Sequence, residues 1–286
     1  MKIGFIGLGV MGRPMAAHLI EARHELFLHR VKHVSQHLVD KGGVALDSAK
    51  AVAEAAEIVI LMLPDTPDVE TVLFGENGVA EGLAEGKLVI DMSSISPGAT
   101  KDFARRIAEQ GAGYVDAPVS GGEVGAKAAS LTIMAGGSEA DFERARPLFE
   151  LMGKNITRIG EVGDGQTAKV TNQIIVGLTI EAVAEGLALA KAAGADPAKV
   201  RDALMGGFAS SRILEVHGER MIKGTFDPGF RVRLHRKDIG LALQAARELE
   251  LCLPHTASLE QLMHKALAEG LGDKDHSSLY RIVAKQ

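Results

Sequence analysis

Three glycines near the start of the chain have the spacing of a dinucleotide-binding turn. Gly7, Gly9 and Gly12 follow the apolar segment 3–6 and precede a segment with helical apolar spacing. Gly7 permits a tight turn, Gly9 leaves room for a pyrophosphate, and Gly12 lets the helix pack close to the strand. The phosphates would bind N–H groups at the positive end of this helix. The alternative is a glycine turn without a ligand. The expected cofactor contacts in this turn are Gly7, Gly9, Val10, Met11 and Gly12.

The end of the second expected strand bears on which nicotinamide cofactor binds. NAD sites usually place Asp or Glu about 20 residues after the glycines, but the strand 25–29 ends in His29 and Arg30 with no carboxylate. A guanidinium at Arg30 suits a 2′-phosphate and stacks on adenine. We therefore expect NADP(H) to be preferred, with contacts from His29 and Arg30. NAD(H) stays open, because Arg30 can also be a solvated strand end.

A second glycine pair ends a later strand. In the segment 116–122, Ser120 offers a hydroxyl, and Gly121 and Gly122 offer unshielded backbone N–H groups. Ligands bind at this edge of open α/β sheets, so these residues could form a cradle for a substrate carboxylate. A plain glycine turn is the alternative.

Lys169, Asn172 and Gln173 share one face of an expected helix, because they are three and four residues apart. The face is otherwise apolar, and burying such groups unpaired costs a few kcal/mol. A cleft at a domain junction would supply polar partners, whereas a solvated first turn would need none. Lys237 and Asp238 begin a later helix and either reach the same cleft or form a charged helix start.

The elements that position these side chains fall into two parts. Strands and helices alternate to about residue 160, which predicts a Rossmann-like, doubly wound parallel sheet of the α/β class. An all-α C-terminal domain should follow. We expect residues 1–163 to bind NAD(P) and residues 164–286 to bind substrate and form oligomers. The strands after the first are expected at 25–29, 58–63, 88–91, 114–116, 131–135 and 155–159, and the helices of the second part at 166–193, 197–205, 213–222, 235–249, 254–268 and 277–284.

The helix 166–193 is the longest expected element, with about 28 residues and roughly 42 Å. Its middle is apolar on nearly all sides, and such a helix is buried on several sides. A domain of this size cannot cover it alone. We therefore expect a homo-oligomer, a dimer or a tetramer.

The composition of the chain indicates which kinds of binding partner and which cellular compartment to expect. The chain has 286 residues and a net charge of −5, so it lacks the basic surface that nucleic-acid binding requires. Cys252 is the only cysteine, which fits a reducing cytoplasm. The apolar run 174–180 is far shorter than the ~20 residues that cross a bilayer, so no membrane partner is expected. His29, His33 and His37 are spaced by four, but no fourth ligand is evident, and no metal is expected.

Four sequence motifs, from the glycine turn at 7–12 to the pair Lys237-Asp238, together resemble those of the β-hydroxyacid dehydrogenases. This family contains 3-hydroxyisobutyrate dehydrogenase and tartronate semialdehyde reductase. The resemblance covers the whole chain. The segments 91–97, 206–211 and 275–277, and Gln173 beside Asn172, are similar to the tartronate semialdehyde reductase branch. The four motifs are Gly7-x-Gly9-x-Met11-Gly12, the segment 116–122, Gly163-x-Gly165-x-x-x-Lys169-x-x-Asn172 and Lys237-Asp238.

The resemblance implies a role for each matching residue. Lys169 would be the catalytic acid–base and Asn172 would orient the substrate, while the role of Gln173 stays open. The substrate carboxylate would bind Ser120, Gly121 and Gly122, and Phe230 and Asp238 would line the pocket. The remaining cofactor contacts would be Met62, Leu63, Pro64, Ser94 and Lys237.

Membership of that branch would imply NAD(P)H-dependent reduction of 2-hydroxy-3-oxopropanoate to D-glycerate, in glyoxylate metabolism. Two alternatives stay open. The first is a reductase of another small carboxylate semialdehyde, of the 3-hydroxyisobutyrate or 4-hydroxybutyrate type, since pocket size and not the motifs would decide. A non-catalytic NADP-binding module is the alternative from another class, and Lys169 with its two amides argues against it.

Overall fold

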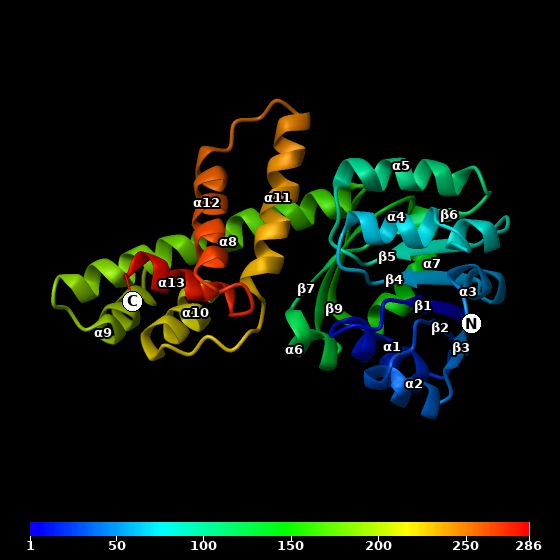
Figure 1. Cartoon of the computed structure of the whole chain (residues 1–286), viewed down its shortest axis with the longest axis horizontal. Coiled ribbons are helices and arrows are strands. Elements are labelled where there is room, and N and C mark those ends of the chain that lie inside the picture. The colour runs from blue at the N-terminus through cyan, green and yellow to red at the C-terminus, as the bar shows by residue number, and fades with distance from the viewer. Residues whose placement is uncertain (286) are drawn as a thin grey trace. The chain divides into compact units, whose positions relative to one another are not determined.

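Alternating strands and helices build the first unit of the computed structural model, Met1–Lys169 (Figure 1). The structure describes residues 1–285. The strands are β1 (Lys2–Ile6), β2 (Glu25–His29), β3 (Val44–Leu46), β4 (Ile58–Leu61), β5 (Leu88–Asp91), β6 (Gly113–Asp116), β7 (Val119–Ser120), β8 (Leu131–Gly136) and β9 (Gly153–Gly160). The helices are α1 (Gly12–Glu21), η1 (His33–Ser35), α2 (Gln36–Asp40), α3 (Ala49–Ala55), α4 (Thr66–Phe74), η2 (Val79–Gly82), α5 (Pro97–Ala108), α6 (Gly122–Lys127) and α7 (Glu139–Glu150).

The strands form one mixed, mainly parallel sheet in the order β3-β2-β1-β4-β5-β6-β8-β7, with β9 paired to β8. The pairs from β3 to β6 are all parallel, and the strand order reverses beside β1, as in doubly wound folds. The predicted Rossmann-like α/β class is therefore confirmed. The sheet is not parallel throughout, however, since β8 is antiparallel to β6 and β7. The link from β7 to β8 is shorter than the dozen or more residues that a parallel crossover needs.

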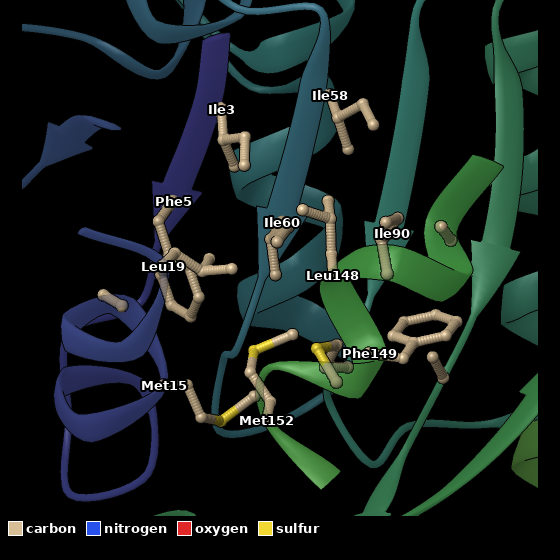
Figure 2. Packing of buried hydrophobic residues seen from close by; sticks show 14 of the residues in the cluster. Ile3, Phe5, Met15, Leu19, Ile58, Ile60, Ile90, Leu148, Phe149 and Met152 are labelled. Carbon is tan, nitrogen blue, oxygen red and sulfur yellow. The ribbon is translucent and has the colours of Figure 1, made fainter. Parts of the chain in front are cut away.

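Helices cover both faces of this sheet, and an apolar core lies on each face. The helices α4 and α5 lie over one face, and α1 and α2 lie over the other (Figure 1). On the second face, Met15 and Leu19 of α1 pack with residues of α7 against the central strands. Figure 2 shows Leu19 beside Phe5, and Met15 extending toward Met152. The central strands β1, β4 and β5 are buried on both sides, which is why their sequences are nearly continuous apolar runs.

The second unit begins at Val170 and is helical. Its longest helix, α8 (Asp164–Ala192), starts within the last residues of the first unit. The all-α C-terminal part is thus confirmed. The division after Lys169 reflects only which residues contact one another. The predicted boundary between an NAD(P)-binding part, 1–163, and a substrate-binding part, 164–286, stays a prediction. The other helices are α9 (Pro197–Leu204), α10 (Arg212–Lys223), α11 (Val232–Glu248), α12 (Pro254–Ala268), η3 (His276–Ser278) and α13 (Leu279–Val283).

Within the described chain, one helix is long and apolar enough to cross a membrane, judged by length and composition alone. This helix is α8, and the finding differs from the expectation based on the uninterrupted run 174–180. Core helices pass the same test. Because Ile180, Ala184 and Leu187 of α8 lie in the core of the second unit, the length and composition are weak evidence for a membrane span.

Candidate active site

The glycine turn connects β1 to α1 and has the shape that a pyrophosphate site requires. Gly7 has a φ of 109°, and a Cβ there would overlap the carbonyl oxygen of Met62. A Cβ on Gly12 would overlap the carbonyl oxygen of Gly7, whereas one on Gly9 would meet no atom within 4 Å. Met11 precedes α1 and makes no side-chain cap, and the start of a helix is a favourable place for an anion. These features fit a dinucleotide cofactor.

The segment that follows β4 lies beside this turn. Met62 donates its backbone N–H to Ile6 at 2.9 Å, and Leu63 donates to the hydroxyl of Ser93 at 2.9 Å. Of the expected cofactor contacts Met62, Leu63 and Pro64, the first two thus connect the end of β1 to the segment that contains Ser94. Their contact with a cofactor stays a prediction.

Arg30 directly follows β2 and is exposed. The strand register pairs His29 with Ile6, which places Arg30 level with Gly7 at the same edge of the sheet. Arg30 has a φ of 55°, a left-handed conformation that Asn and Asp tolerate better than other non-glycine residues. The ring of His29 contacts the carbonyl oxygen of Leu46 at 3.2 Å. Arg30 therefore lies at the same edge of the sheet as the glycine turn, and its contact with a cofactor stays a prediction.

A buried carboxylate holds the start of α8. Asp116, at the end of β6, accepts hydrogen bonds from the backbone N–H groups of Gly163 at 2.7 Å and Gln166 at 2.8 Å. Burial raises the pKa of the Asp116 carboxyl to about 7, although the two N–H groups act in the opposite direction. Asp116 thus fixes the first turn of the helix that carries Lys169.

Gln166 connects this first turn to the segment after β5. Its side chain accepts from the N–H of Ile95 at 3.1 Å and donates to the carbonyl oxygen of Ser93 at 2.7 Å. Ser93 in turn donates its N–H to Asp91 at 2.9 Å. The Gln166 side chain therefore holds the backbone of the residues on both sides of Ser94. Asp91 and Gln166 were not among the residues predicted from the sequence. Asp91 ends a fully apolar strand next to the one that ends at Asp116, and that pattern could have revealed it.

Lys169 lies one turn further along α8 and is buried, with 7% of its surface exposed. Its Nζ donates to the carbonyl oxygen of Val119 at 2.9 Å, next to Ser120 in β7. After Ser120 the chain turns through Gly121 and Gly122, whose φ angles are 131° and 60°. Both angles favour glycine. The first unit therefore brings Lys169 to the strand that carries Ser120 and the glycine pair.

The second unit joins four other residues that the sequence singled out, namely Asn172, Gln173, Lys237 and Asp238. Gln173, 4% exposed, donates its side-chain amide to Oδ2 of Asp238, which is 3% exposed. Asn172 donates to Oε1 of Gln173 at 2.9 Å. Lys237 pairs with Oδ1 of Asp238 at 3.0 Å. The amides and the Lys-Asp pair thus form one hydrogen-bonded group.

A histidine cluster that the sequence analysis did not predict adjoins this group. His235 contacts the backbone oxygen of Gln173 at 3.1 Å through Nε2, and its Nδ1 lies 3.0 Å from Nδ1 of His276. The other nitrogen of His276 lies 3.3 Å from Nε2 of His217. Burial lowers the pKa of His276 well below its usual value. The ring of Phe230 packs on His235 and His276, with centroids 5.7 and 5.6 Å away.

His217, His276 and Asp275 have ligand atoms close enough to hold a metal ion. The guanidinium of Arg220 is already 3.2 Å from Asp275, and a positive charge there disfavours a cation. Asp275 also caps η3 by accepting from the N–H of Ser277. His29, His33 and His37, which are spaced by four in the sequence, lie in three different elements, β2, η1 and α2.

Comparisons with known proteins cover both units. Residues 2–160 match the NAD binding domain of 6-phosphogluconate dehydrogenase. Residues 163–283 match the NAD-binding domain of NADP-dependent 3-hydroxyisobutyrate dehydrogenase. Together these two models span nearly all of the chain.

Whole-chain relatives agree with these domain matches. The chain is 58% identical to 2-hydroxy-3-oxopropionate reductase of Escherichia coli, over 99% of this chain and 97% of the relative. It is 36% identical to 3-hydroxyisobutyrate dehydrogenase of Pseudomonas aeruginosa, over 98% of both chains. The structure of 3-hydroxyisobutyrate dehydrogenase of Mycobacterium tuberculosis with L-serine superposes with a TM-score of 0.91, at 30% identity and 98% coverage of both chains.

Proposed function

The chain belongs to the β-hydroxyacid dehydrogenases, NAD(P)-dependent oxidoreductases that act on CH–OH groups, and from this premise we propose that it reduces 2-hydroxy-3-oxopropanoate to D-glycerate. The observation that carries the proposal is the 58% identity, over almost the full length of both chains, to a 2-hydroxy-3-oxopropionate reductase. The product would connect the enzyme to glyoxylate metabolism.

The glycine turn and the strand ends beside it would hold the cofactor, with NADP(H) preferred over NAD(H). The reduced nicotinamide, when bound, supplies a hydride to the aldehyde carbon. Arg30 supports the NADP(H) preference, because it is exposed at the edge of the sheet that carries Gly7. The residues proposed to contact the cofactor are Gly7, Gly9, Val10, Met11, Gly12, His29, Arg30, Met62, Leu63, Pro64, Ser94 and Lys237.

Lys169 would be the general acid. As the hydride arrives, negative charge grows on the carbonyl oxygen, and the ammonium of Lys169 stabilises this charge and donates the proton that completes the alcohol. Acid catalysis of this kind contributes about 10² to 10⁴-fold in rate. Burial of Lys169 and its contact with Val119 support this role, because they hold the ammonium in one place.

The substrate would be held by its carboxylate and by an amide. Ser120, Gly121 and Gly122 supply a hydroxyl and backbone N–H groups for the carboxylate, and Asn172 orients the substrate. Phe230 and Asp238 would line the pocket. We further propose that the enzyme is a cytoplasmic homo-oligomer.

Product analysis tests the reaction directly. The protein is incubated with 2-hydroxy-3-oxopropanoate and NADPH, and the glycerate formed is resolved by chiral chromatography. We expect one D-glycerate for each NADPH oxidised. NADPH binding without any turnover would instead favour the non-catalytic module, and turnover of a different semialdehyde alone would favour a related dehydrogenase.

A further inference from the structure

The side-chain amide of Gln173 is hydrogen-bonded to two other side chains, one that accepts from it and one that donates to it. Its amide nitrogen donates to Oδ2 of Asp238, and its Oε1 accepts from Nδ2 of Asn172 at 2.9 Å. Gln173 and Asp238 are almost fully buried. Inside a protein, such buried polar groups keep their hydrogen bonds because unpaired ones are costly.

The chain Asp238–Gln173–Asn172 has a defined polarity. Asp238 is a carboxylate paired with Lys237 at 3.0 Å, so it accepts hydrogen bonds and donates none. Gln173 must therefore turn its nitrogen toward Asp238 and its oxygen toward Asn172. Asn172 must then turn its nitrogen toward Gln173. Its Oδ1, which can only accept hydrogen bonds, is then the amide atom on the side away from Gln173.

The backbone of Gln173 is held as firmly as its side chain. His235 lies 3.1 Å from the Gln173 carbonyl oxygen, and a carbonyl only accepts, so Nε2 of His235 carries the proton. Gly177 lies close to this ring, since a Cβ there would lie 3.2 Å from a ring carbon of His235 and 2.6 Å from a methyl carbon of Leu259. His235 is fully buried and is supported in turn by His276. The position of Gln173 is thus set from two sides.

We propose that Gln173 is a positioning residue that fixes the orientation of the Asn172 amide, and that this orientation selects semialdehydes with a hydroxyl on C2. This inference rests on the proposed function. The C2 hydroxyl of 2-hydroxy-3-oxopropanoate donates to Oδ1 of Asn172. Methylmalonate semialdehyde has a methyl group at the same carbon and cannot donate. Sites built to bond a hydroxyl discriminate strongly against analogues that lack it, because their polar groups are then left unpaired.

The test compares these two substrates in Gln173→Leu, Asn172→Ala and the double variant. Removing the Gln173 amide lets Asn172 rotate, so kcat/KM for 2-hydroxy-3-oxopropanoate should fall about tenfold, the value of one hydrogen bond. The kcat/KM for methylmalonate semialdehyde should change by less than about twofold. In the Asn172→Ala background, Gln173→Leu should cause no further loss. Gln244→Leu is the control, because Gln244 bonds only to Glu248 among the described contacts and is exposed.

Equal losses for both substrates, or additive losses in the double variant, would show a purely structural role and overturn the inference. A second measurement does not depend on the substrate. Neutron diffraction from crystals in D2O locates the deuterons of the Asn172 amide. Deuterons on the atom that faces Gln173 support the fixed orientation of the Asn172 amide even if the enzyme turns over another semialdehyde, and an oxygen at that position overturns the inference.

Discussion

The ammonium nitrogen of Lys169 lies 2.9 Å from the carbonyl oxygen of Val119. This contact joins the first turns of α8 to β7, the strand that carries Ser120. A lysine side chain has a flexible four-carbon stem, and the carbonyl restricts where its ammonium lies. The proposed acid is therefore held beside the proposed carboxylate site by the fold of the first unit itself.

Replacing Lys169 by Ala should remove the acid and leave the glycine turn intact. We expect kcat to fall by about 10² to 10⁴-fold, while the Kd for NADPH, measured by fluorescence titration, changes by less than about twofold. Lys127→Ala is the control, because Lys127 is an exposed lysine paired with Glu123. Turnover near the wild-type rate in a folded Lys169→Ala variant would exclude Lys169 as the acid.

The cofactor preference should depend on Arg30. In Arg30→Asp, the carboxylate repels the 2′-phosphate of NADPH and bonds the ribose hydroxyls of NADH, so the ratio of kcat/KM for NADPH to that for NADH should invert. Asp tolerates the φ of 55° at this position. Arg23→Asp is a matched control, since Arg23 is also exposed with a positive φ of 64° but precedes β2. An unchanged ratio in Arg30→Asp would place recognition of the 2′-phosphate elsewhere.

Short-range patterns explain most of what the sequence predicted correctly. The bounds of β2 and β5 agree with the expected strands, and α8 begins two residues before the expected helix. Apolar runs and glycines mark such elements locally. The strand expected at 58–63 ends at Leu61.

The parts that were not predicted depend on contacts between distant segments. β3 and β7 contain three and two residues, too few to show a pattern. Gln166 and Ser93 are 73 residues apart, and no spacing rule relates them. The sequence predicted that Lys169 and Gln173 would have polar partners. Only the fold shows that these partners are the Val119 carbonyl and the Asp238 carboxylate.

Asp116 should titrate near neutral pH. Its pKa is raised to about 7 by burial, so the ¹³C signal of its carboxyl carbon should have a midpoint near pH 7, whereas ordinary aspartates titrate near about 4. The folded protein then keeps a proton that the unfolded chain loses, and the stabilisation from Asp116 decreases as pH rises from about 4 to 7, by at most about 1.4 kcal/mol per pH unit. Asp116→Asn lacks this dependence. A midpoint near pH 4 would contradict the expectation.

The exposed face of α8 should form a subunit interface. Ile175 and Leu189 are 61% and 72% exposed, and the exposed residues Ala182 and Gly186 lie between them at helical spacing. We expect a dimer or tetramer by light scattering at low micromolar concentration, and smaller species for Leu189→Glu. Leu249→Glu is the control, because Leu249 is 68% exposed outside α8. An active wild-type monomer would contradict this prediction.

The most direct test of the central claim is a substrate panel with the wild-type protein. The kcat/KM with NADPH is measured for 2-hydroxy-3-oxopropanoate, methylmalonate semialdehyde and succinic semialdehyde, and each is repeated with NADH. Our account predicts the highest kcat/KM for 2-hydroxy-3-oxopropanoate with NADPH, by at least about tenfold, which corresponds to one hydrogen bond. A higher kcat/KM for either of the other two semialdehydes would contradict it.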